Sequence, residues 1–283
     1  MVKIIADSTC DLSKEWIEKY DITILPLHIL LGEQEYRDGV DITPEEIFAW
    51  SDKNKTTPKT SAPSLVEAME CLQPYIEAGR EVVCFSISYS MSTSGNVMRL
   101  AAEELEAGNL VTVIDSANLS TGIGHLVVEA AIMAGQGKDA KTIAKEIEEL
   151  KPRVRASFVV DTLTYLYRGG RCNAVAALVG GALKLHPKIV VENGAMDATK
   201  KYRGRLDHVI LSYTKDMEKE LKTAKRERVF ITHSGCDKET VDKVREYLES
   251  LQHFDEVIET RAGGVISSHC GPGTLGVLFI AQN

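Results

Sequence analysis

The chain has 283 residues, of which 44% are hydrophobic and 26% are charged, so it has room for two ordinary domains and a substantial core. The formal net charge is -8 and the sequence contains no block of Lys and Arg, so we expect no nucleic-acid partner. No apolar run approaches the roughly 18 residues that cross a bilayer. The first ten residues, MVKIIADSTC, lack the basic start and the apolar stretch of a signal peptide. We therefore expect a cytoplasmic protein with no stable membrane insertion.

Three apolar strands of the N-terminal half end in hydroxyl-bearing turns, and a helix follows each turn. The strands are expected at residues 3–6, 82–87 and 110–114, and their turns contain Ser8 and Thr9, then Ser88 to Ser94, then Ser116, Ser120 and Thr121. Strands that alternate with helices predict a parallel sheet with helices on both faces, which binds ligands beyond the carboxyl ends of its strands. Because the turn after residue 87 aims N–H groups and hydroxyls at one point near a helix N-terminus, it is suited to an anion. The repetition indicates a role beyond helix capping.

Between these strands, residues 22–31 predict one strand interrupted by Pro26, and residues 33–41 predict a polar hairpin or loop. Thr43 is expected to cap a helix that begins at Pro44, with Glu46 completing a capping box. Loop residues 53–64 then lead into a helix over 65–76.

From about residue 156 the pattern changes to that of an α+β domain with a mixed sheet. Strands are expected at 157–160, 188–192, 194–198, 206–213, 229–233, 256–261 and 277–281, a small-residue helix at 174–183, an amphipathic helix at 240–251 and a Gly-rich loop at 263–276. We therefore predict two domains: residues 1–157 form a three-layer parallel α/β domain, and residues 158–283 form the mixed-sheet α+β domain.

The six cysteines are Cys10, Cys71, Cys84, Cys172, Cys236 and Cys270. They are scattered, and no two of them stand at metal-ligand spacing, so we expect reduced thiols and no metal site. The sequence also lacks the Gly-x-x-x-x-Gly-Lys-Ser/Thr pattern of a nucleotide phosphate loop. We expect no cofactor.

Six ordered motifs give the chain a family resemblance over its whole length. They are Asp7-Ser8-Thr9, Thr60-Ser61-Ala62-Pro63-Ser64, Asp115-Ser116, Gly169-Gly170-Arg171, Lys201-Tyr202-Arg203-Gly204 and His269-Cys270-Gly271-Pro272-Gly273. With these motifs the chain resembles the DegV family, which includes the fatty-acid-binding subunits of bacterial fatty acid kinase. The resemblance implies a lipid-binding protein without catalytic residues of its own. Such a protein buries a long-chain fatty acid between its domains and presents the carboxylate to a cognate kinase subunit, which forms the acyl phosphate.

The same resemblance implies which residues hold the carboxylate: Thr60, Ser92 and the N–H of Thr93, with Arg171, His269 and Ser61 around them. The family usually has Leu-Ser-Gly-Thr where this chain has Met91-Ser92-Thr93-Ser94. This departure leaves Ser90 as an alternative to Ser92. An apolar slot for the tail is expected along Ala177, Val179, Leu183, Ile189, Val191, Val265, Ile266 and Leu275.

Several alternatives stay open at this point. His269 is either a solvated loop residue or a hydrogen-bond partner that orients Thr60, and Arg171 frames the site, caps a helix or pairs with Asp38. A serine hydrolase would use Ser92 as nucleophile, His269 as base and Asp7 or Asp115 to orient it, but the sequence has no Gly-x-Ser-x-Gly elbow. The other alternative is a protein that binds a phosphorylated small metabolite at the hydroxyl-bearing turns. His125 and His233 have no motif partner, and we interpret them as structural.

Overall fold

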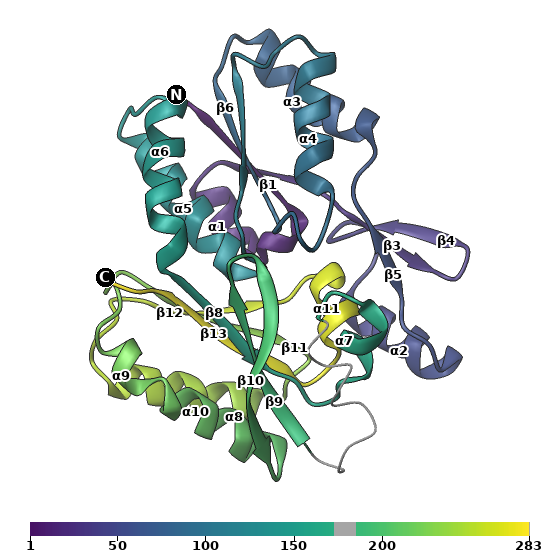
Figure 1. The fold of residues 1–283 in the computed structure, drawn as a ribbon, viewed down its shortest axis with the longest axis vertical. Coiled ribbons are helices and arrows are strands. Elements are labelled where there is room, and N and C mark those ends of the chain that lie inside the picture. Colours follow the sequence, from purple (N-terminus) through teal and green to yellow (C-terminus); the bar gives the residue numbers. More distant parts are fainter. Residues whose placement is uncertain (173–184, 283) are drawn as a thin grey trace.

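The structure is a computed structural model, and it describes residues 1–172 and 185–282. Its strands form a four-stranded sheet, a six-stranded sheet and a small three-stranded sheet. Figure 1 shows the four-stranded sheet above the six-stranded sheet, with the small sheet at their side. The predicted α/β architecture, a parallel sheet followed by a mixed one, is confirmed.

The four-stranded sheet has the strand order β2-β1-β6-β7, and all of its neighbouring strands are parallel. The elements of this layer are β1 (Lys3–Asp7), η1 (Ser8–Cys10), α1 (Lys14–Lys19), β2 (Ile22–Leu25), α3 (Leu65–Glu77), β6 (Val82–Ser86), α4 (Ser94–Glu104), β7 (Val111–Asp115), α5 (Thr121–Gly135), α6 (Ala140–Leu150) and η2 (Lys151–Arg153). Every residue of β1 and β6 is buried, since α3 and α4 cover one face of the sheet and α5 and α6 cover the other (Figure 1).

The small sheet has the order β4-β3-β5 and is antiparallel. It consists of β3 (His28–Leu31), β4 (Gln34–Arg37) and β5 (Lys59–Ser61), and α2 (Pro44–Asn54) lies between β4 and β5 in the chain. The prediction of one strand over residues 22–31 was wrong, because the chain leaves the parallel sheet at Pro26 and enters a different sheet at His28. The capping box of Thr43 and Glu46 is confirmed.

The six-stranded sheet has the order β10-β9-β8-β13-β11-β12, with only the β11–β12 pair parallel among these strands. The elements of this part are β8 (Val154–Val159), α7 (Thr164–Gly169), β9 (Leu185–Glu192), β10 (Ala195–Arg203), α8 (Leu206–Asp216), α9 (Glu218–Leu221), β11 (Val229–Ser234), α10 (Lys238–Ser250), β12 (Val257–Arg261), α11 (Gly264–Cys270) and β13 (Thr274–Ile280). The predicted domain boundary after residue 157 falls inside β8 and stays a prediction. The expected helix at 174–183 lies outside the described residues.

Two further predictions were wrong in this half. Residues 206–213 form α8 rather than a strand, and Val209, Ile210 and Tyr213 are buried at the spacing of one helix face. The expected Gly-rich loop contains α11, whose first residue is Gly264. A Cβ atom at this glycine would lie 2.5 Å from Cδ1 of Ile29, so glycine lets the helix start against the small sheet.

Helix α5 lies between the two large sheets and joins their cores. On one side its residues pack with Ile4 and Phe85 of the parallel sheet, and on the other with Phe230 and Leu278 of the mixed sheet. An apolar helix such as this one, buried on nearly all sides, is typical of a protein interior. The two sheets therefore share one continuous hydrophobic core.

Candidate functional site

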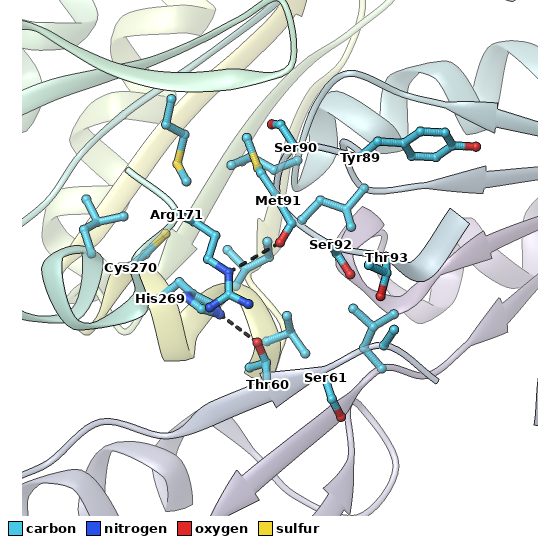
Figure 2. A pocket seen from close by; sticks show the side chains of 18 residues that line it. Thr60, Ser61, Tyr89, Ser90, Met91, Ser92, Thr93, Arg171, His269 and Cys270 are labelled. Atoms are coloured by element: carbon cyan, nitrogen blue, oxygen red, sulfur yellow. Dashed lines mark hydrogen bonds between the residues drawn. The ribbon is translucent and has the colours of Figure 1, made fainter. Parts of the chain in front are cut away.

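A cavity of about 460 Å³ lies where β5, the turn between β6 and α4, and α11 meet. Its lining residues are Leu27, Thr60, Ser61, Ala62, Ile87, Tyr89, Ser90, Met91, Ser92, Thr93, Leu119, Leu166, Arg171, Met196, Val265, Ile266, His269 and Cys270. All six residues that the resemblance pointed to lie in this list. Figure 2 shows Thr60 and Ser61 on the strand at one side of the cavity, with Ser92 and Thr93 on the turn at the other.

Thr60 and His269 are joined by a hydrogen bond of 2.8 Å between Oγ1 and Nε2 (Figure 2). Strand β5 supplies Thr60, and the last turn of α11 supplies His269. Burial and, to a smaller extent, the nearby Arg171 cation lower the pKa of His269 to about 4. The imidazole is therefore neutral at neutral pH.

The surroundings of the second ring nitrogen indicate which tautomer His269 adopts. Nδ1 is buried and has no hydrogen-bond partner in the described part of the chain. A buried N–H without an acceptor is rarer in proteins than a buried acceptor without a donor, so we assign the proton to Nε2. In this tautomer His269 donates to Oγ1 of Thr60, and the hydroxyl hydrogen of Thr60 is available to a ligand.

The turn after β6 offers two more donors. Oγ of Ser92 accepts a hydrogen bond of 3.2 Å from the Ser94 amide, but within residues 1–172 and 185–282 its own hydroxyl hydrogen has no acceptor. The Thr93 amide likewise has no acceptor among these residues. By contrast, the hydroxyls of Ser88 and Ser90 both donate to the carbonyl of Gly194. Of the serines considered, Ser92 is therefore better placed than Ser90 to donate to a ligand.

Arg171 is the one charged side chain among the described residues that line the cavity. Its guanidinium donates to the carbonyl of Gly169 at 2.7 Å. It also donates to the carbonyl of Met91 at 3.4 Å (Figure 2). It does not pair with Asp38, whose carboxylate accepts from Ser8 and Gly264 instead. Two of its donor groups are thus held by main-chain carbonyls, and they keep the cation beside the cavity.

The predicted apolar slot is only partly the observed lining. Val265 and Ile266 line the cavity, whereas Ile189, Val191 and Leu275 are buried in the core away from it. Ala177, Val179 and Leu183 lie outside the described residues. Sequence reasoning missed the apolar lining residues Leu27, Ile87, Tyr89, Met91, Leu119, Leu166 and Met196. Tyr89 and Met91 alternate with serines in the turn after β6, and this alternation was a usable signal.

The geometry of a serine hydrolase is not assembled. His269 bonds Thr60 rather than Ser92. The carboxylate of Asp7 accepts from Ser94 and from the amide of Ile87, and that of Asp115 accepts from the amides of Tyr89 and Ala117. Neither carboxylate bonds the imidazole, so the described residues contain no acid–base–nucleophile relay of this kind.

The hydroxyls that end β1 and β7 do not reach the cavity. Ser8 and Thr9 donate to Asp38 and Asp7, and Ser120 donates to Asp11. Of the turns after β1, β6 and β7, the turn after β6 is therefore the one that offers a phosphorylated metabolite free hydroxyls in the described part of the chain. No cluster of three potential metal ligands occurs in the described residues, and the six cysteines form no disulfide there.

Among the described residues, no helix is both long and apolar enough to cross a bilayer. The model of the DegV family, which is described as a family of uncharacterised proteins, matches residues 1–282. A DegV domain-containing protein of Deinococcus radiodurans is 31% identical over 276 residues, which cover 98% of this chain and 97% of that protein.

Three solved structures resemble this chain over its full length. A DegV family protein from Thermus thermophilus, described for fatty acid binding, has a TM-score of 0.91 and 29% identity, with 99% of both chains covered. A stearic-acid-binding protein from Eubacterium ventriosum has a TM-score of 0.86 and 32% identity, covering 100% of this chain and 99% of that one. DegV from Bacillus subtilis, described as a fatty acid binding protein, has a TM-score of 0.84 and 26% identity, covering 99% of each chain.

Proposed function

Because the chain belongs to the DegV family, we propose that it binds a long-chain fatty acid between its two large sheets and presents the carboxylate to a separate kinase subunit. The kinase subunit would bind ATP and form the acyl phosphate, and the protein would act beside it in the cytoplasm. The fatty-acid-binding proteins from Thermus thermophilus and Eubacterium ventriosum support the choice of ligand.

The observation that carries this proposal is the convergence of three donors on a largely apolar cavity. The hydroxyls of Thr60 and Ser92 and the amide of Thr93 line it, and none of their hydrogens has an acceptor in the described residues once His269 donates to Thr60. Much of the remaining lining consists of apolar side chains. A carboxylate with a long hydrocarbon tail satisfies both parts.

The carboxylate head and the hydrocarbon tail of the ligand contribute differently to the free energy of binding. Burying a tail of more than a dozen carbons contributes about 10 kcal/mol, at about 0.8 kcal/mol for each CH₂. Each hydrogen bond to the charged carboxylate contributes about 1.5 to 3 kcal/mol. The tail therefore supplies most of the affinity, and the donors orient the head.

Neutral donors suit a carboxylate that has to react. A Lys ammonium bound to the head would compete with phosphoryl transfer, whereas hydroxyls hold one carboxylate oxygen and leave the other for attack. The product adds negative charge to the head, and Arg171 is the lining cation that can balance it.

The experiment removes both hydroxyls in the double variant Thr60→Ala, Ser92→Ala. Bound lipid per protein is measured by mass spectrometry, and acyl phosphate is measured with the cognate kinase. We expect fatty acid to remain bound while acyl phosphate formation falls at least tenfold, because the attacking oxygen is no longer held in position.

The matched control is Thr223→Ala, Ser212→Ala, since those hydroxyls donate only to helix carbonyls on the surface. Retained lipid with undiminished product in the double variant would show that these hydroxyls do not orient the head. The isolated chain, without kinase, should neither consume ATP nor hydrolyse a chromogenic ester.

A further inference from the structure

Three carboxylates, those of Asp7, Asp11 and Asp38, are buried beside the cavity without lining it. Their residues are 0%, 5% and 2% exposed, and the described residues provide no Lys, Arg or His to pair with any of them. Burial is the main cause that raises the pKa of all three, and neighbouring carboxylates add to the rise for Asp11 and Asp38; the pKa of Asp38 is raised to about 6. Burying three carboxylates close together disfavours their ionisation and is costly. We therefore expect these residues to serve a function.

Two of the carboxylates hold the start of α11. Oδ1 of Asp11 accepts from the Gly263 amide at 2.8 Å, and Oδ1 of Asp38 accepts from the Gly264 amide at 2.7 Å. Their other oxygens accept from Ser120 and Ser8, which lie on the parallel-sheet side of the molecule. The position of α11, and with it that of His269 in its last turn, is thus fixed to elements far away in the sequence.

The third carboxylate holds the opposite wall of the cavity. Oδ2 of Asp7 accepts from the Ile87 amide at 2.9 Å and from the Ser94 hydroxyl at 2.7 Å. The Ser94 amide in turn donates to Oγ of Ser92. Asp7 therefore acts on the head-group donor Ser92 through a single intervening residue.

We propose that Asp7, Asp11 and Asp38 are positioning residues that set the two walls of the carboxylate site relative to each other: Asp7 sets Ser92, and Asp11 and Asp38 set the Thr60–His269 pair through α11. This inference rests on the proposed function. It explains the Asp7-Ser8-Thr9 motif, because Ser8 donates to Asp38 and Thr9 donates to Asp7. Each group bonded to the carboxylates is a donor, so the ionised form of each Asp satisfies the geometry.

The test uses the full chain loaded with palmitate that carries ¹³C at its carboxyl carbon. The ¹³C chemical shift, followed against pH, reports the hydrogen bonding and the pKa of the bound carboxyl group. In Asp38→Ala we expect palmitate to stay bound, the pKa of its carboxyl to rise by about one unit, and phosphoryl transfer to fall at least tenfold, because lost donors favour the neutral acid. Asp38→Asn keeps the volume and one acceptor, and should give intermediate values.

The matched control is Asp237→Ala. Asp237 accepts from the Thr240 amide at 2.8 Å at the start of α10, away from the cavity, so its loss should lower the melting temperature and leave the palmitate signal unchanged. If both Asp38 variants melt earlier but give the wild-type ¹³C shift and pKa, the carboxylates are structural only and the inference is overturned. If Asp38→Ala does not fold, the ¹³C shift and the pKa of palmitate bound to Asp38→Asn provide the test.

A second readout needs no lipid, and so it separates this inference from the proposed function. The ¹⁵N shifts of the His269 ring report its tautomer and its bond to Thr60. They should change in Asp38→Asn and stay constant in Asp237→Asn. If wild-type protein takes up no palmitate, the proposed function is wrong. If the ¹⁵N shifts of the His269 ring are unchanged in Asp38→Asn, the positioning role is wrong.

Discussion

Thr60 and His269 lie 209 residues apart in the sequence and 2.8 Å apart in the structure. No local pattern in the sequence predicts such a contact, because it depends on how α11 packs against the small sheet. Only the family resemblance pointed to this pair. The neutral state of the imidazole is a property of the folded chain, because burial and the neighbouring Arg171 lower its pKa. Its orientation depends on the hydrogen bond to Thr60.

Gly169 is the residue that makes room for the His269 ring. A Cβ atom at position 169 would lie 2.3 Å from Nδ1 of His269, so Gly169→Ala should displace the ring and break its bond to Thr60. We expect bound fatty acid to persist and acyl phosphate formation with the kinase to fall at least tenfold, since the head loses its orientation rather than its tail contacts. Lipid content and product formation are measured on the same preparation.

The control for this substitution is Gly135→Ala at the end of α5, where nothing lies within 4 Å of an added Cβ. It should preserve activity and leave stability unchanged or slightly higher, because Ala is the better helix former. Full activity in Gly169→Ala would show that the position of the His269 ring does not matter for presentation of the head.

His269 should also make stability depend on pH. Its pKa is about 4 in the folded protein and about 6.5 in the unfolded chain, so between these values only the unfolded state takes up the proton. Its contribution is complete above pH 6.5 and is lost as the pH falls towards 4, by at most about 1.4 kcal/mol per pH unit.

This dependence is measured by urea unfolding at pH 7.5 and pH 4.5. Wild type should lose more stability than His269→Gln on going to the lower pH, whereas His208→Gln, at an exposed ring, should follow wild type. The difference between variants is the informative quantity, because Asp38, whose pKa is raised, contributes in the opposite direction. Identical losses in wild type and His269→Gln would contradict the assignment of a buried, neutral imidazole.

At the scale of elements, strands and helices with strong local patterns were predictable, and those decided by packing were not. Short, mostly apolar runs predicted β1 and β6, and capping residues predicted α2. The α8 segment contains several β-branched and aromatic residues that favour a strand, but burial of one of its faces on the mixed sheet makes it a helix. Helix α11 was missed because its start is stabilised by distant carboxylates rather than by its own residues.

The hairpin of β9 and β10 contacts the serine turn through the carbonyl of Gly194. Gly194 has φ +81°, and a Cβ atom there would lie 2.7 Å from Oγ of Ser88. Gly194→Ala should therefore lower the free energy of unfolding by about 1 to 3 kcal/mol more than Gly79→Ala, since it adds lost hydrogen bonds to backbone strain. Gly79 has φ +64° and nothing within 4 Å, so it isolates the strain. Equal losses in urea unfolding would show that the hairpin contact adds nothing to stability.

At the scale of the whole molecule, the order of elements predicted the parallel sheet and then the mixed one. It did not predict that α5 joins both sheets in one core. The sequence pattern of an apolar helix does not indicate whether one sheet or two sheets cover it. Nor did the order of elements predict the third sheet, which brings Thr60 to the cavity. The site is assembled where all three sheets meet, and that meeting point is a property of the complete fold.

The central claim is that the cavity holds a long-chain fatty acid, and native lipid content tests it most directly. The protein is purified without added lipid and extracted, and the extract is quantified by mass spectrometry. We predict close to one equivalent of long-chain fatty acid per chain. A protein that is free of lipid and also takes up no palmitate in a titration would contradict the claim.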